Sequence, residues 1–506
     1  MIPAQATDEG AAAHTATPSR PPASRRGGAI ERRAATRHAA GWIATEAAVG
    51  MVGAVVTTFL VARLIGPAEV GRAALAAAVV MFVQPVAAYA FTNAMVQRAR
   101  LEPEDVATAF WTSLGLAIAL VVPIAAAGLA LPQLFAPGVG PVLAALALVL
   151  PLNAVEGAAN GVLLRSGAFR RLALRGIGAT LAGLTTGLGL ALAGAGAWAV
   201  VGQQLAYFGT AALLAAALAP LSAPLAFRPR TLRDMRPFAV TSAVSGIAER
   251  GGFRIFLIAV AGGLPALAGV LQIAFRIVEM ARDLPSPFVH RYGLPALSRL
   301  RDDRAGFLRR LEALCLLAGL AFAPAFAGLA LCAPEVQAVL LGPAWAGIVA
   351  PVQALSAALA LTAFHLPVGM GFTAVGRPGV NLHLTLWGLA AMLMLALLVP
   401  EGSAVAAALA WAATLAVSTL AGGVLAARRL GFAIARQVRV AAASLLPAAA
   451  TVAAVLGAGV AGLLPVAPLS ALLAKIAIGV AAGGPGMIAL GRRPWREVCA
   501  PVPEGG

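Results

Sequence analysis

The sequence predicts an all-α, polytopic integral membrane protein with about fourteen transmembrane helices, and three observations lead to that prediction. Of the 506 residues, 60% are hydrophobic and only 11% are charged, whereas a soluble domain has about 25% charged residues. The apolar residues form runs of about 20, the length of a helix that crosses a bilayer. The arginines gather between these runs. This composition excludes a soluble enzyme, a secreted disulfide scaffold and a disordered protein.

The candidate spans are apolar segments separated by charged residues or by glycine and proline. They lie at 41–62, 73–96, 106–131, 139–163, 176–194, 197–220, 238–261, 264–288, 309–332, 347–370, 380–400, 402–427, 440–461 and 467–490. The eighth is the least apolar and carries four charged residues. Because lipid leaves no partner for an exposed backbone group, each segment is expected to be a helix.

The arginines predict which side of the membrane each loop faces. With a cytoplasmic N-terminus, Arg63 and Arg72 are the only positive residues on the opposite side. The cytoplasmic segments then hold Arg98, Arg100, Arg165, Arg170, Arg171, Arg175, Arg228, Arg230, Arg233, Arg236, the run from Arg282 to Arg310, Arg377, Arg428, Arg429, Arg436, Arg439, Arg492, Arg493 and Arg496. This asymmetry predicts a multi-pass membrane protein with both termini cytoplasmic. The net charge of +17 therefore marks a membrane face, and we expect no nucleic acid partner.

An internal repeat divides the chain. FLVARLIGPAEVG (59–71) can be laid over FLIAVAGGLPALAG (256–269), which suggests two duplicated halves with a cavity between them. The expected parts are a disordered basic cytoplasmic tail (1–37), a six-helix bundle (38–222), a cytoplasmic linker (223–237), a second, pseudo-symmetric six-helix bundle (238–430), and an extra helix pair with a cytoplasmic tail (431–506).

Charged residues within the spans are candidates for substrate binding, because each costs several kcal/mol in lipid. Arg250 and Arg254 lie four residues apart, on one helical face, with Glu249 beside them. Two guanidiniums on one face suit a diphosphate. Arg276 and Glu279 are similarly spaced on the next span. For both sets the alternative is an internal ion pair whose role is only structural.

The first half offers carboxylates and amides. Glu46 and Glu156 could pair with arginines of the second half, bind a coupling proton or sodium ion, or lie at a water-exposed mouth. Amides suit sugar hydroxyls but also join helices. The amide candidates for sugar contact are Asn93, Gln97, Asn153 and Asn160. Lys475 is expected to extend to the lipid headgroups. We expect no metal and no cofactor.

Five segments resemble the Wzx-type polysaccharide-export flippases of the multidrug/oligosaccharidyl-lipid/polysaccharide (MOP) superfamily. They are LVARLIGPAEVGRAALA (60–76), AMVQRARLEPEDVATAFWTSL (94–114), LLRSGAFRRLALR (163–175), GAWAVVGQQL (196–205) and APEVQAVLLGPAWAGIVAPVQAL (333–355). The resemblance implies a flippase of the bacterial inner membrane. It would move a lipid-linked oligosaccharide, such as an O-antigen or exopolysaccharide repeat unit on polyprenyl diphosphate, by alternating access. Membrane lipids, a polysaccharide polymerase and export machinery are the further partners it implies.

Two other functions remain open from the residues. A multidrug (MATE-like) antiporter of the same superfamily would need an acidic cavity for cations, whereas this chain offers more arginine than carboxylate there. A membrane-embedded glycan polymerase or ligase would need a large outer loop with catalytic residues, and every expected outer loop is short. The sequence contains no nucleotide-binding GxxxxGK[ST], no G-x-S-x-G and no HExxH. We therefore expect a transporter and not an enzyme.

Overall fold

The computed structural model describes residues 41–86, 91, 95, 98, 102–219, 226–283 and 293–499, and these residues contain helices and no strand. Ten helical stretches are long and apolar enough to cross a membrane. The all-α, multi-pass class is therefore confirmed, while the number fourteen stays a prediction. The tail expected at 1–37 and two of the amide candidates, Asn93 and Gln97, lie outside the described residues.

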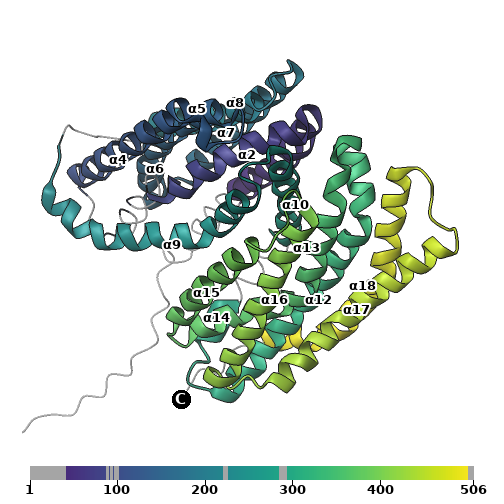
Figure 1. The fold of residues 1–506 in the computed structure, drawn as a ribbon. Helices are drawn as coiled ribbons and strands as arrows, with labels where there is room; N and C mark the ends of the chain where they lie inside the picture. Colours follow the sequence, from purple (N-terminus) through teal and green to yellow (C-terminus); the bar gives the residue numbers. More distant parts are fainter. Residues whose placement is uncertain are drawn as a thin grey trace, which may run out of the picture.

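The first half of the chain forms one group of helices (Figure 1). Its first stretch, from Gly41 to Gln84, includes a π-helical turn. The elements are a helix over 41–56, η1 Thr57–Val61, α2 Ala62–Gln84, α4 Pro103–Ala130, η3 Pro132–Leu134, α5 Val139–Ala147, α6 Val149–Arg165, α7 Phe169–Leu192 and α8 Trp198–Leu218. Reciprocal side-chain to backbone hydrogen bonds of Glu102 and Asp105 begin α4, with Pro103 in its first turn.

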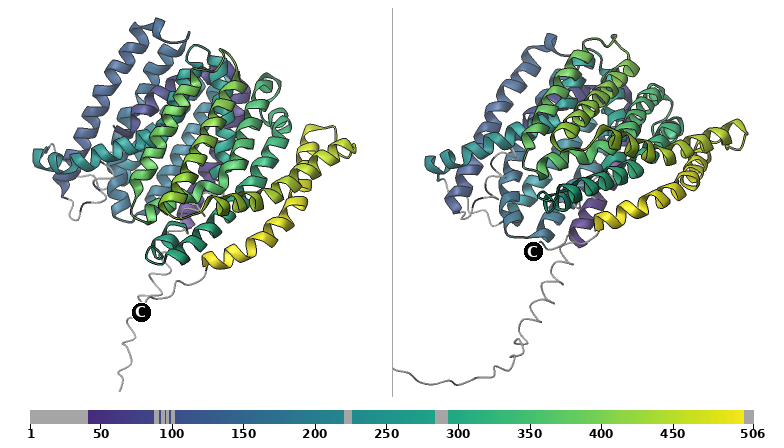
Figure 2. Two further views of the ribbon diagram at one scale, coloured as in Figure 1. Left: turned by 60° about the horizontal axis from the view of Figure 1, so that its bottom comes forward. Right: turned by 90° about the horizontal axis from the view of Figure 1, so that it is seen from below.

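The second half forms another group, with α10 next to the first half and with α17 and α18 on the flank beside α12 (Figures 1 and 2). The elements are α9 Pro229–Ala261, α10 Pro265–Asp283, α12 Arg304–Val336, η4 Gln337–Leu341, η5 Pro343–Ile348, α13 Val349–Thr362, η6 Ala363–His365, α14 Leu366–Ala374, α15 Pro378–Ala396, α16 Ala404–Arg429, α17 Ile434–Val460 and α18 Pro468–Cys499.

The start of α9 lies within the stretch expected as a linker. Residues 229–237 of the stretch expected as a linker (223–237) are the first turns of α9. The buried carboxylate of Asp105 accepts a hydrogen bond from the Thr231 hydroxyl at 2.7 Å. Arg98 lies 3.0 Å from Asp105 and 3.3 Å from Asp234. These contacts fix the first turns of α9 to the start of α4.

The same short sequence, Pro-Ala-x-x-Gly, follows the kink of α2 at Gly66 (67–71) and begins α10 (265–269) and η5 (343–347). The first and third copies follow a π-helical turn and a glycine with positive φ, Gly66 (φ 80°) and Gly342 (φ 83°). Glycine adopts this backbone conformation without steric cost. The starts of α2, α10 and η5 all contact one another, so the three copies meet at one end of the molecule.

The halves touch there backbone to backbone. A Cβ atom on Gly71 would collide with the carbonyl oxygen of Pro265 and lie 2.8 Å from the Gly269 nitrogen. Conversely, a Cβ on Gly269 would collide with the Pro67 carbonyl and lie 3.1 Å from the Gly71 nitrogen. The crossing of α2 and α10 is therefore reciprocal, as expected where duplicated halves meet.

Side chains from this end join the same contact. Trp345 is fully buried and donates from Nε1 to the Ala62 carbonyl at 3.2 Å. Arg63 donates to the carbonyl of Val339 at 2.9 Å. Hydrogen bonds donated from both halves therefore connect η4 and η5 to the first helical stretch at this end of the molecule.

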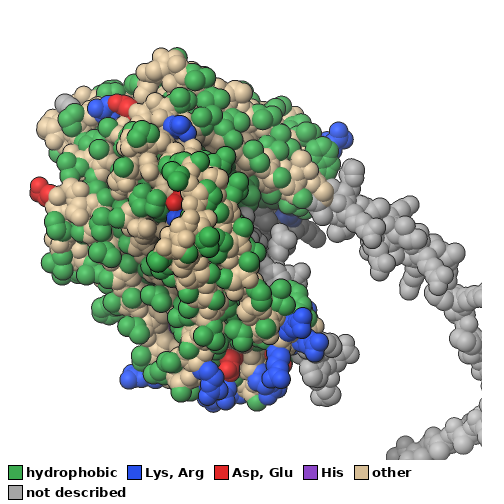
Figure 3. Space-filling model, turned by 90° about the vertical axis from the view of Figure 1, so that its right-hand side faces the viewer, with side chains coloured by type: hydrophobic (Ala, Val, Ile, Leu, Met, Phe, Trp, Pro, Cys, Tyr) green, Lys and Arg blue, Asp and Glu red, His purple; other side chains and the backbone are tan. Residues whose placement is uncertain are grey.

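Most of the visible surface is apolar, and Lys and Arg gather at one end of it (Figure 3). The exposed apolar side chains of the protein include Leu398 (76%), Val460 (92%) and Val480 (68%). Since water disfavours so large an apolar area, lipid is the solvent that it fits.

Candidate functional site

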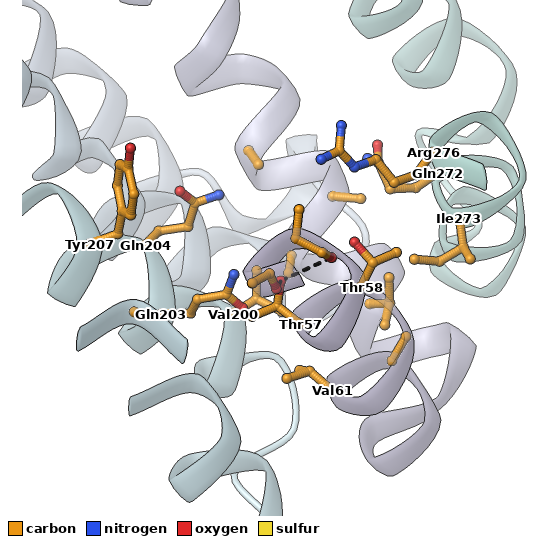
Figure 4. Close-up of a pocket in the computed structure, with 18 of the residues that line it drawn as sticks. Thr57, Thr58, Val61, Val200, Gln203, Gln204, Tyr207, Gln272, Ile273 and Arg276 are labelled. Atoms are coloured by element: carbon orange, nitrogen blue, oxygen red, sulfur yellow. Dashed lines mark hydrogen bonds between the residues drawn. The ribbon is translucent and has the colours of Figure 1, made fainter. Parts of the chain in front are cut away.

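A cavity of about 500 Å³ lies between the two halves. The first half lines it with the helix that precedes α2 and with α2, α7 and α8, and the second half with α9 and α10. Figure 4 shows α8 side chains on one side of the cavity, α10 side chains on the other, and Thr57, Thr58 and Val61 between them. The volume is within the range of about 300–1,000 Å³ for small-molecule sites.

The second half supplies the charged wall. Arg254 of α9 and Arg276 and Glu279 of α10 all line the cavity. Arg276 and Glu279 are 3.9 Å apart and about one-third exposed, which confirms that they share a helical face. The Arg276 guanidinium points from α10 into the space between the two walls (Figure 4). The described lining residues thus carry two positive charges and one negative charge.

Glu249 and Arg250 also lie on α9, as expected. Their side chains are outside the part that the structure describes, so their place in the site stays a prediction. Arg250 is one helical turn before Arg254 in the sequence.

A cluster of aromatic rings supports the charged wall. The ring of Phe253, next to Arg254, lies 4.3 Å from that of Phe275, next to Arg276. Trp411 of α16 lies edge-on to Phe275 with the ring centres 4.9 Å apart. Because such rings pack in few orientations, the cluster holds α9 and α10 together and positions the two arginines relative to each other.

The first half supplies a neutral polar wall that sequence analysis missed. Gln203, Gln204 and Tyr207 of α8 line the cavity, together with Thr58 and with Thr180 of α7. The available signal was the pair of adjacent glutamines in GQQLAYFG (202–209), the most polar part of an apolar span. Which face of α8 the cavity meets depends on tertiary packing, so the sequence pattern alone left these residues unassigned.

Glu46 and Glu156 form ion pairs, but not with the second half as expected. Arg175 of α7 lies 2.6 Å from Glu156 and 3.7 Å from Glu46. Its guanidinium also donates to the side-chain oxygen of Asn160 at 2.6 Å. The partner was missed because the sequence places Arg175 in a cytoplasmic loop, whereas α7 already begins at Phe169. A role of either carboxylate in ion coupling stays a prediction.

Asn153 and Asn160 do not line the cavity. Asn153 is buried and donates to the Val149 carbonyl one turn earlier in α6. Asn160 belongs to the Arg175 cluster. Both amides therefore bond within the first half, and a role in sugar contact stays a prediction.

Lys475 of α18 is paired rather than extended to the headgroups. Its ammonium lies 2.7 Å from Glu335 and donates to the Leu331 carbonyl at 2.9 Å. The two side chains are only 14% and 15% exposed. This ion pair corrects the expected placement and joins the last helix to α12.

Breaking this pair is expected to destabilise the protein. Lys475→Met leaves the Glu335 carboxylate without its cation, and a hydrogen bond to a charged group contributes about 1.5–3 kcal/mol. Lys475→Met/Glu335→Leu should regain most of that loss because no buried charge is left unpaired. Thermal unfolding in detergent measures both variants. An unchanged melting temperature in Lys475→Met would contradict a structural role for the pair.

The comparisons with known proteins agree with this architecture. Residues 60–350 match the family model described as "Polysaccharide biosynthesis protein". The succinoglycan biosynthesis transport protein ExoT of Rhizobium meliloti (strain 1021) is 27% identical over 305 residues, which are 58% of this chain and 59% of that protein. The match thus spans less than two thirds of that relative's length.

Two solved structures share the fold. Lipid II flippase MurJ in an inward closed conformation has a TM-score of 0.72 at 12% identity, over 90% of this chain and 99% of that chain. An inward-facing multidrug resistance MATE family transporter of the MOP superfamily has a TM-score of 0.58 at 18% identity, over 78% of this chain and 95% of that chain. At these identities the likeness concerns the fold alone. The family match, which covers more than half of the sequence, assigns the chain to the family of polysaccharide biosynthesis proteins.

Proposed function

We propose that the protein is a flippase that moves a polyprenyl-diphosphate-linked oligosaccharide across the bacterial inner membrane. The observation that carries the proposal is the intramembrane cavity with Arg254 and Arg276 on one wall. A lipid diphosphate crosses a bilayer slowly because its charges must leave water. Guanidiniums in the cavity replace that water with donors that match phosphate oxygens. Arg250 is proposed as a third donor, with Glu249 and Glu279 as the acidic residues beside these arginines.

The relatives support the substrate class. The family is that of polysaccharide biosynthesis proteins, and the ExoT relative is called a succinoglycan biosynthesis transport protein. Repeat units of such polymers are assembled on a lipid, so a transporter of this family would meet a lipid-linked oligosaccharide and the surrounding membrane lipids. A polysaccharide polymerase and export machinery are the proposed users of the product.

Alternating access fits the contacts between the halves. The Pro-Ala-x-x-Gly starts join the halves at one end, and the cavity extends along α2 and α10 from that contact. Arginine-rich segments at the start of α12, the end of α16, the start of α17 and the end of α18 support a cytoplasmic location for the other end. The joined end would then face outward, and both termini would be cytoplasmic.

Reconstitution in liposomes tests this function. Wild-type protein is expected to expose a fluorescent undecaprenyl-diphosphate oligosaccharide to a quencher outside the vesicle within minutes, whereas protein-free liposomes keep the inner-leaflet lipid protected. The readout is the fraction of the fluorescence that is quenched over time. Proton-driven export of a cationic dye, with no movement of the lipid, would contradict the proposal and favour the drug antiporter.

A further inference from the structure

Three glutamines in the cavity have no hydrogen-bond partner. Within the described part of the chain, the side chains of Gln203, Gln204 and Gln272 make no hydrogen bond although all three line the cavity. The Oε1 atom of Gln272 is buried and unsatisfied. A buried polar group without a partner costs about 1–3 kcal/mol. The buried Gln272 oxygen therefore needs a partner that enters the cavity, and the half-buried amides of Gln203 and Gln204 are free to bond the same ligand.

Most other amides in the described part of the chain behave differently. Six of them, all away from the cavity, donate hydrogen bonds within their own half. They are Asn153 to Val149, Asn160 to Glu156, Gln337 to Gly342, Gln353 to Ala330, Asn381 to Gly369 and Gln437 to Gly423. Three of these bonds, those of Gln353, Asn381 and Gln437, join neighbouring helices, as amides inside a membrane commonly do. The cavity glutamines do not serve that purpose, so helix packing does not explain them.

The α8 residues form one continuous surface. Tyr207 follows Gln203 by four residues and Gln204 by three, so all three lie on neighbouring positions of one helical face. Gly183 and Gly187 of α7 permit this placement, because a Cβ at Gly187 would lie 2.8 Å from the Gln203 Cβ and one at Gly183 would lie 3.1 Å from the Tyr207 Cβ. Figure 4 shows this surface across the cavity from Arg276.

From this arrangement we infer that the α8 surface (Gln203, Gln204 and Tyr207) binds the sugar joined directly to the diphosphate of the lipid. The inference rests on the proposed flippase function and divides the site between the halves. Arg254 and Arg276 of the second half hold the diphosphate, and the α8 surface of the first half holds the adjacent sugar. An amide both donates and accepts, as a sugar hydroxyl does, and this wall carries no charge that would compete for the phosphates.

The consequence is selectivity for the glycan. A site built to hydrogen-bond a hydroxyl discriminates strongly against a ligand that lacks it, because its polar groups are then left unpaired. Each neutral hydrogen bond changes an affinity about two- to tenfold. The protein is therefore expected to prefer the glycosylated lipid over bare undecaprenyl diphosphate.

Binding of two kinds of lipid to the purified, full-length protein tests the inference. The probes are bare undecaprenyl diphosphate and undecaprenyl diphosphate carrying one glucose, galactose or N-acetylglucosamine. The wild type is expected to bind at least one glycosylated lipid about tenfold or more tightly than the bare lipid. Gln203→Leu/Gln204→Leu should reduce that ratio to about one and leave the affinity for the bare lipid unchanged. Gln353→Leu, which removes an amide outside the cavity, is the matched control and should keep the wild-type ratio.

The binding results distinguish failure of the flippase function from failure of the sugar site. A wild type that binds neither lipid contradicts the flippase function itself. A wild type that binds both lipids equally with every sugar, or a double variant that keeps the preference, overturns the sugar site and leaves the diphosphate site standing. The bare-lipid affinity reports on folding. If the double variant loses it, the single variants Gln203→Leu and Gln204→Leu are measured instead, and an unchanged preference in both overturns the inference.

Discussion

Arg276→Ala is expected to slow flipping of the lipid-linked oligosaccharide about ten- to hundredfold. Arg276 projects into the cavity from α10, and among the described residues its counter-charge is the Glu279 carboxylate 3.9 Å away. Its hydrogen bonds to a phosphate would each contribute about 1.5–3 kcal/mol, and 1.4 kcal/mol changes an equilibrium tenfold. The initial flipping rate in liposomes measures the effect.

The lysine variant separates charge from geometry. Arg276→Lys keeps the positive charge but loses the planar fork that binds two phosphate oxygens at once. We therefore expect an intermediate rate for it. Arg254→Ala should resemble Arg276→Ala, because Arg254 lines the same cavity from α9.

The control for these variants is Arg301→Ala. Arg301 is 68% exposed, lies outside the cavity and contacts Asp302 of its own loop. The control should flip at the wild-type rate. Wild-type rates in both Arg254→Ala and Arg276→Ala would remove the diphosphate site from the proposal.

The fold class was predictable because lipid constrains the backbone of each apolar segment separately. A run of about 20 apolar residues must be helical in lipid whatever it packs against, so the multi-pass architecture follows from composition. The first turns of α9 were missed because RPRTLRDMRPF (228–238) is too polar for a span. That part becomes a helix through tertiary contacts, including the hydrogen bond between Thr231 and Asp105.

Only part of the site was predictable, and the reason is geometric. Arg254, Arg276 and Glu279 were found because a charge within an apolar span is unusual wherever it points. Gln203 and Gln204 were missed because a neutral amide in a span commonly joins helices. Only the packing of α7 and α8 shows that these two side chains join nothing and face the cavity. The partner of Glu156 was missed because Arg175 lies near a span boundary, and boundaries are the least certain part of such a prediction.

The crossing of α2 and α10 gives the largest expected effect on stability. Gly71→Val is expected to cost more than about 3 kcal/mol, the upper end for overpacking, and to prevent accumulation of folded protein. The added Cβ would meet the Pro265 carbonyl and the Gly269 nitrogen, and backbone atoms cannot rotate away as a flexible side chain does. Thermal unfolding in detergent and the yield of monodisperse protein measure the loss.

Matched variants show whether the crossing or the valine itself is responsible. Gly115→Val introduces the same β-branched residue within α4, where a Cβ meets nothing within 4 Å, and should cost almost nothing, because valine is no poorer a helix former than glycine. Gly269→Val should resemble Gly71→Val, because its Cβ would collide with the Pro67 carbonyl. The two sites share one contact, so the cost of the double variant should fall below the sum of the two single costs. Equal costs at Gly71 and Gly115 would show that the close approach of the halves contributes little to the stability of the fold.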